Sequence, residues 1–253
     1  MSILMEQILD ITVLAGEIML RNGAETSRVE ETMFHMARAL GAVKAECFVI
    51  PTGVFLTVTC PDGRTRTIMR RVHDRTINLD RIAKVNELSR RLADKRIDYE
   101  MVCCHLERIA RERTGFSLLP SMLASGVVGG ASAILLNAGV FESMAAFISA
   151  LVVRYIAHVV SRLHGVKFTF EFLGGMTAAL MGMQFHYLWP ALSPDIVVVG
   201  GVMPLVPGVA ITNAIRDVIA GDLLSGLSRG LEAALTAVAV SMGVVIILAV
   251  SAY

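Results

Sequence analysis

The residues best suited to chemistry lie in one apolar stretch near the carboxyl end of the chain. Pro204 and Pro207 stand three residues apart, Gly208 follows directly, and Thr212 and Asn213 come about one helical turn later. Because proline lacks a backbone donor, this spacing predicts a helix that breaks within the stretch. Broken helices in membranes occur mainly where they line a cavity or are buried in protein. The pattern predicts a substrate path lined by these five residues; the alternative is a packing kink that binds nothing.

The break also predicts which solutes such a path would favour. Proline is common in the first turn of a helix, so the second half-helix is expected to begin near Pro207. That first turn carries partial positive charge and free N–H groups, as in transporters with discontinuous helices. A carboxylate-bearing solute is therefore expected at the break.

Four ionisable residues are candidates for proton or ion coupling. Asp217 and Asp222 follow the break, where a partly desolvated carboxylate would have a raised pKa. Arg154 and His158 lie one helical turn apart in another apolar stretch. Ionised groups are costly in hydrocarbon, so these positions point to function, although Arg154 could instead extend its charge to the membrane surface.

A short polar segment in the first half of the chain is a second candidate site. It contains His73, Asp74 and, a few residues later, Asn78. Histidine beside a carboxylate can act as an acid or base; the alternative is that Asp74 or Asn78 caps the next helix. The four cysteines have no metal-binding spacing, and no nucleophile or phosphate-loop motif occurs. We therefore expect no catalytic residues, no metal and no cofactor.

Composition divides the chain into two unlike regions. Of the 253 residues, 55% are apolar and 18% are charged, and the mean hydropathy is +0.64. Residues 1–113 hold 18 basic and 16 acidic side chains, whereas residues 114–253 hold five and six. This contrast argues against a single soluble globule, a disordered chain and a strongly basic nucleic-acid-binding protein. It predicts a soluble domain over 1–113 and a membrane domain over 114–253.

Periodicity and turn chemistry predict the elements of the first region. Helical spacing of apolar residues alternates with short β-prone runs that are separated by Pro and Gly turns. Helices are expected over 3–21, 26–40, 79–95 and 99–113, and strands over 47–50, 54–60 and 64–71. Together they predict a cytoplasmic α+β domain with an antiparallel three-stranded meander.

The second region contains five apolar stretches that each approach the ~20 residues needed to cross a bilayer. They are expected at about 116–137, 140–160, 168–188, 196–215 and 231–252. The loops after the second and fourth stretches hold the Arg and Lys residues, so the positive-inside rule places residues 1–113 in the cytoplasm and Tyr253 outside. The predicted membrane domain is a five-helix transmembrane α-bundle with a broken fourth helix, and its glycines suit packing against a partner.

Three segments carry a resemblance to a known family. The stretch PLVPGVAITNAIRDVIAGDLLSGLSRGLEAAL resembles the signature of the threonine/serine exporter (ThrE) family, and NGAETSRVEETM and HDRTIN are similar to its soluble portion. In length and span count the chain is most similar to the short YjjP form of the family. The motif residues carried over are Gly23, Glu30, His73, Asp74, Asn78, Pro207, Gly208, Asn213, Asp217, Gly221, Asp222, Gly226 and Arg229.

The resemblance implies a function that composition does not. It implies an inner-membrane subunit that exports threonine and serine, or a dicarboxylate such as succinate, driven by the proton gradient. The expected partners are the solute, the lipid membrane and a second five-span membrane subunit of roughly 150 residues, or further copies of the chain. The alternatives are a membrane-anchored enzyme or sensor whose activity lies in residues 1–113, and a scaffold that transports nothing.

Overall fold

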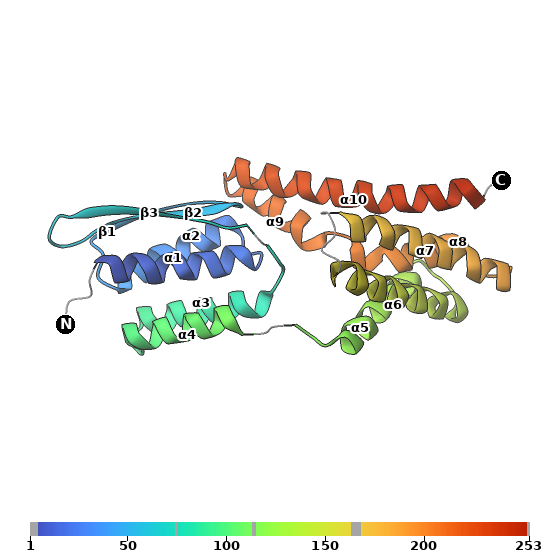
Figure 1. The fold of residues 1–253 in the computed structure, drawn as a ribbon, viewed down its shortest axis with the longest axis horizontal. Coiled ribbons are helices and arrows are strands. Elements are labelled where there is room, and N and C mark those ends of the chain that lie inside the picture. The colour runs from blue at the N-terminus through green and yellow to red at the C-terminus, as the bar shows by residue number, and fades with distance from the viewer. Residues whose placement is uncertain (1–4, 74, 113–114, 163–167, 252–253) are drawn as a thin grey trace. The chain divides into compact units, whose positions relative to one another are not determined.

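The computed structural model describes residues 5–73, 75–112, 115–162 and 168–251, and its helices and strands are shown in Figure 1. Contacts between Cα atoms divide the chain into two compact units. Unit 1 comprises Met1–Thr114 and Val209–Gly230, and unit 2 comprises Gly115–Gly208 and Leu231–Tyr253. Residues 209–230, which the sequence analysis assigned to the membrane domain, therefore group with the amino-terminal residues.

Unit 1 contains the predicted meander. Its strands run over Lys44–Ile50 (β1), Gly53–Thr59 (β2) and Thr65–Arg71 (β3). Both neighbouring pairs are antiparallel in the order β1-β2-β3, with Leu56 of the central strand opposite Cys47 and Ile68. The β2–β3 turn has Gly63 at φ +79, a conformation that suits glycine. The prediction of a three-stranded antiparallel sheet is confirmed.

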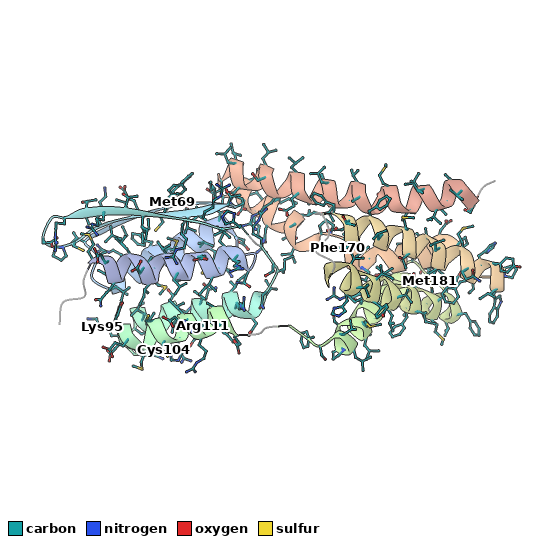
Figure 2. All side chains as sticks on the ribbon, viewed as in Figure 1. Met69, Lys95, Cys104, Arg111, Phe170 and Met181 are labelled. Atoms are coloured by element: carbon teal, nitrogen blue, oxygen red, sulfur yellow. The ribbon has the colours of Figure 1, made fainter. Side chains whose placement is uncertain are left out.

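Helices cover one face of this sheet. They run over Met5–Arg21 (α1), Thr26–Ala39 (α2), Leu79–Ala93 (α3) and Tyr99–Arg111 (α4). Figure 1 shows α1 and α2 along the sheet, which they contact. One core joins them: Val54, Leu56 and Val58 of β2 are completely buried. Alternate β3 residues face outward, and Met69 is 60% exposed (Figure 2), so the amphipathic pattern decides which face is covered.

Unit 2 is formed mainly by apolar helices. They run over Leu118–Leu135 (α5), Val140–Arg162 (α6), Thr169–Leu188 (α7) and Pro194–Val202 (α8), and a 3-10 turn (η1) covers Met203–Leu205. Helix α9 (Gly208–Ile219) follows in unit 1, and α10 (Leu223–Ser251) continues into unit 2. Within the described residues α5, α6 and α10 are long and apolar enough to cross a membrane, and α8 with η1 and α9 count as one more broken span.

The prediction of five spans is shown only in part. Helix α7, the expected third span, has 20 residues but is not among the helices that qualify by length and composition. Its Glu171, Gln184 and His186 lower its hydropathy. A five-helix bundle and its orientation therefore stay predictions, whereas a mostly helical chain with several apolar helices is shown.

Glycines set the spacing of the helices within unit 2. A Cβ atom at Gly175 would lie 2.2 Å from the backbone oxygen of Val240, and one at Gly243 would lie 2.1 Å from that of Phe172. Helices α7 and α10 can approach this closely only because both positions lack a side chain. These glycines thus pack helices of the same chain.

Candidate functional site

Three motif segments meet at the loop between α1 and α2, here called the α1–α2 loop (residues 22–25). Helix α1 ends where Gly23 adopts φ +89, and the N–H of Ala24 donates to the oxygen of Met19 at 3.1 Å. This left-handed glycine turn is a common helix ending. Asn22 is buried and its Nδ2 donates to the oxygen of Ile18 at 2.6 Å. The loop is therefore held in one conformation from within.

The polar segment before α3 contacts the α1–α2 loop through its backbone. The N–H of Thr76 donates to the oxygen of Arg21 at 2.8 Å, and that of Asn78 donates to the oxygen of Asn22 at 2.9 Å. The side chain of Asn78 also accepts from the N–H of Arg81 at 3.1 Å and caps α3. The capping alternative is thus confirmed for Asn78. His73 is exposed, and Asp74 lies outside the described residues.

Helix α9 contacts the same loop from a position about 190 residues later in the chain. Nδ2 of Asn213 donates to the oxygen of Gly23 at 2.8 Å. One turn on, Oδ1 of Asp217 accepts from the N–H of Thr26, the first residue of α2, at 3.0 Å. The residue before α2, Glu25, makes no capping bond with its side chain. Asp217 therefore serves as the cap of α2.

Arg229 completes this set of contacts from α10. Its Nη2 donates to the oxygen of Ala24 at 2.6 Å, and its Nε lies 3.0 Å from Oδ2 of Asp217. Asp217 is fully buried and Arg229 is nearly so, whereas Arg216 forms an exposed ion pair with Glu25. We call Asn213, Asp217 and Arg229, with the backbone groups they bind, the loop network.

The loop network satisfies each of its buried charges with a specific partner. A buried ion pair stabilises a fold only when hydrogen bonds satisfy the remaining polar atoms, and removal of one partner leaves a costly uncompensated charge. Here Asp217 binds both a cation and an N–H group, and Arg229 binds both an anion and a carbonyl. The arrangement can hold residues 209–230 against the amino-terminal helices.

Two further carboxyl groups lie beside the loop network. Burial raises the pKa of Asp222, and the negative charge of Asp217 raises it further. Burial also raises the pKa of Glu30, where donation from the N–H of Val49 at 2.8 Å opposes the shift and the charge of Asp222 adds to it. Asp222 and Glu30 are therefore the groups in this site that bind protons more readily than ordinary carboxylates.

The break in the fourth apolar stretch lies where the sequence predicts it. Pro204 is in η1, Pro207 lies between η1 and α9, and α9 begins at Gly208. Thr212 is on the exposed side of α9, whereas Asn213 is buried in the loop network. As the lining of a substrate path these residues remain a prediction.

The structure does not bring Arg154 and His158 to the acidic residues within one unit. Both lie on α6 in unit 2, where Nε of Arg154 donates to Oγ of Ser121 at 2.7 Å and His158 is half-buried. Among the described residues, no three His, Cys, Asp or Glu side chains gather as a metal site would require.

Sequence reasoning missed the part of the site that is made of backbone. The Ala24 carbonyl and the Thr26 N–H carry no side-chain signal, although the Asn22-Gly23 pair at a helix end marks the turn that exposes them. The motif segments did contain Gly23, Asn213, Asp217 and Arg229, but their spacing in sequence does not show that they meet.

Long apolar helices attached to a small α+β unit define a membrane protein of the transporter class. The chain belongs to the ThrE family: the family model described as "Putative threonine/serine exporter" matches residues 10–251. This match confirms the family that the three motif segments indicated.

Curated relatives cover nearly the whole chain. It is 27% identical to the "Probable succinate transporter subunit YjjP" of Escherichia coli, over 95% of this chain and 93% of that protein. It is 29% identical to the protein of the same name from Klebsiella aerogenes, over 90% and 87%. The "Probable threonine/serine exporter" of Mycobacterium tuberculosis is 23% identical over 95% of this chain but only 45% of its own length. Comparison with solved structures finds no match.

Proposed function

We propose that the chain is one subunit of an inner-membrane exporter that moves a small carboxylic acid outward. The solute class is threonine and serine or a dicarboxylate such as succinate, and the proton gradient drives export. The proposal is carried by the match, over almost the full chain, to proteins named as transporter subunits. The longer exporter has a further half that this chain lacks, so a second membrane subunit supplies that half.

The break between η1 and α9 is the proposed path for the solute. Gly208 offers a direct test, because a Cβ atom there would meet nothing within 4 Å and the backbone is not left-handed. Gly208→Ala should therefore fold normally, and it should lower flux if the solute passes the break. Gly201→Ala is the packing comparison, because its Cβ would lie 2.3 Å from Oγ of Ser149. Normal flux in Gly208→Ala together with a larger Gly208→Leu would contradict the path.

Asp222 is the proposed proton carrier, in preference to Asp217. Asp217 is committed to Arg229 and to the start of α2, whereas Asp222 is partly exposed with a raised pKa. Asp222→Asn should abolish the response of flux to an imposed proton gradient and leave downhill flux measurable. Unchanged pH-dependent flux in this variant would remove Asp222 from the mechanism.

The decisive experiment is transport by purified protein in liposomes. Labelled threonine, serine and succinate are supplied, with and without the second subunit, and the proton gradient is imposed or collapsed. Flux of one of these solutes that needs both subunits and the gradient is the expected result. Gradient-independent flux would overturn the coupling, and absence of flux for all three solutes would overturn the proposal.

A membrane-anchored enzyme or sensor is the competing function, and deletion of residues 1–113 is too coarse to test it. That deletion removes the Ala24 and Thr26 groups that Arg229 and Asp217 bind, which leaves buried charge unpaired. His73→Ala is the sharper test because His73 is exposed. An enzyme that uses His73 would lose activity in this variant, whereas export should persist.

A further inference from the structure

A small pocket beside the α1–α2 loop has the character of an anion site. It has a volume of about 50 Å³ and lies between α1, α3 and α4. Its polar lining comes from Glu17, Arg21, Asn22 and Arg81. A water molecule needs roughly 10–15 Å³ of such volume, so the pocket has room for a few waters or one small polar group.

Arg81 is the residue whose hydrogen bonding is incomplete. A guanidinium carries five N–H donors. Nη2 of Arg81 donates to the oxygen of Glu112 at 2.5 Å, and Nη1 lies 3.5 Å from Oδ1 of Asn22, at the limit of a hydrogen bond. Nε is buried and has no hydrogen-bond partner. An unsatisfied buried donor on a charged group is costly, so this pocket favours an acceptor with negative charge.

The charges around the pocket favour a single negative group. Arg21 adds a second cation to the lining. Glu17 is the acidic member, and it already forms an ion pair with Arg70 at 3.1 Å. Two cations against one paired anion leave room for one more negative charge.

We propose that this pocket binds one carboxylate group of a small soluble molecule through Arg81. A planar carboxylate matches the fork of a guanidinium and accepts from Nε and a second N–H together. The pocket shares Asn22 with the α1–α2 loop, so the bound group stabilises the segment to which the loop network attaches. This is an effector site in the soluble region, and its binding test does not depend on the proposed export function.

The experiment is titration calorimetry on the full chain in detergent micelles. Acetate supplies the carboxylate alone, serine supplies a carboxylate with an ammonium group, and chloride at equal ionic strength is the control anion. Saturable binding of acetate or serine, at least about tenfold weaker in Arg81→Gln, is expected. Arg91→Gln is the matched variant because Arg91 lies on the same helix, pairs only with Glu87 among the interactions described for it, and is half exposed. Arg91→Gln should bind as the unchanged chain does.

A second variant blocks the pocket without altering a charge. Ala110 lines it from the exposed side of α4, so Ala110→Phe should fill the pocket and leave the core intact. Loss of binding in Ala110→Phe supports the site even if Arg81→Gln does not fold. Equal binding of chloride and acetate, unaltered binding in Ala110→Phe, or no saturable binding would each overturn the proposal and leave a water-filled pocket. Serine binding without acetate binding would also overturn the assignment of the carboxylate as the recognised group.

Discussion

Asp217 illustrates how the same side chain changes its meaning once its partners are known. As an acid after a broken apolar stretch it is a candidate proton carrier. In the fold it is fully buried, caps α2 through Thr26 and pairs with Arg229. A carboxylate held by a cation and an N–H group is stabilised in its charged form. At the residue scale its expected role is therefore to hold residues 209–230 in place.

The first prediction compares the buried and exposed ion pairs. Asp217→Ala should lower the free energy of unfolding by about 3–5 kcal/mol, because Arg229 is left buried without an anion. Arg216→Ala should cost at most about 1 kcal/mol, because its pair with Glu25 is partly exposed. Denaturant unfolding of the purified chain measures both.

The double variant provides the control for this comparison. Asp217→Ala with Arg229→Ala removes both charges, and its cost should be smaller than the sum of the two single costs. Additive costs would show that the two side chains do not interact.

The second prediction concerns pH. The folded state binds a proton at Asp222 more tightly than the unfolded state does, because burial and Asp217 raise its pKa. Stability should therefore fall as pH rises from the ordinary carboxyl range through the raised pKa. Asp222→Asn should unfold at a higher temperature than the unchanged chain at about pH 8 but not at about pH 4.

Asp62→Asn is the matched control for the pH prediction. The pKa of Asp62 is lowered by its hydrogen bond with Arg64, so the same Asp-to-Asn change should decrease stability at neutral pH. The same sign of effect in both variants would contradict the assignment.

At the scale of elements, the α1–α2 loop joins helices that are distant in sequence. Its carbonyls accept from segments before α3 and on α9 and α10. This geometry depends on the left-handed turn at Gly23, which points successive carbonyls outward. Because residues 209–230 connect to unit 2 through the chain at both ends, any movement of the loop is transmitted along the backbone.

The third prediction tests this turn with two glycines. Gly23→Ala and Gly41→Ala both place a side chain on a left-handed residue, which costs about 1–2 kcal/mol. At Gly23 the added Cβ also lies 3.3 Å from the oxygen of Thr76, whereas at Gly41 it meets nothing within 4 Å. Gly23→Ala should therefore be the less stable variant in thermal unfolding. Equal losses would mean that the contact with Thr76 gives way freely.

At the scale of the whole molecule, the cysteines report the orientation of unit 1. All four lie in residues 47–104, so the second region carries no thiol. Cys104 is exposed (Figure 2), Cys60 is buried, and burial with the charge of Glu30 raises the pKa of Cys47 to about 12. Because the thiolate is the reactive form, Cys104 is the most accessible target for a maleimide.

The fourth prediction follows from the proposed cytoplasmic position of residues 1–113. A membrane-impermeant maleimide should label the chain in inverted vesicles and not in intact spheroplasts. Cys104→Ser should remove most of the label and identifies the modified residue. Strong labelling of Cys104 in intact spheroplasts would reverse the orientation.

Local features of the sequence determine most of the elements. Alternation and Pro/Gly turns predicted the meander, helical periodicity predicted α1 to α4, and the two prolines predicted the break before α9. These features act between residues that are neighbours in the chain, so a sequence alone reveals them. The apolar stretches likewise marked the membrane helices, although α7 is too polar to qualify by the same measure.

Only the tertiary structure decided which groups meet. Asp217 and Thr26 are separated by 191 positions, and half of their contact is a backbone N–H that has no sequence signature. The fold thus moved residues 209–230 from an expected membrane segment to the unit of the amino-terminal helices. The physical reason is that buried charges must find partners, and helix ends must find caps, wherever the chain brings them in space.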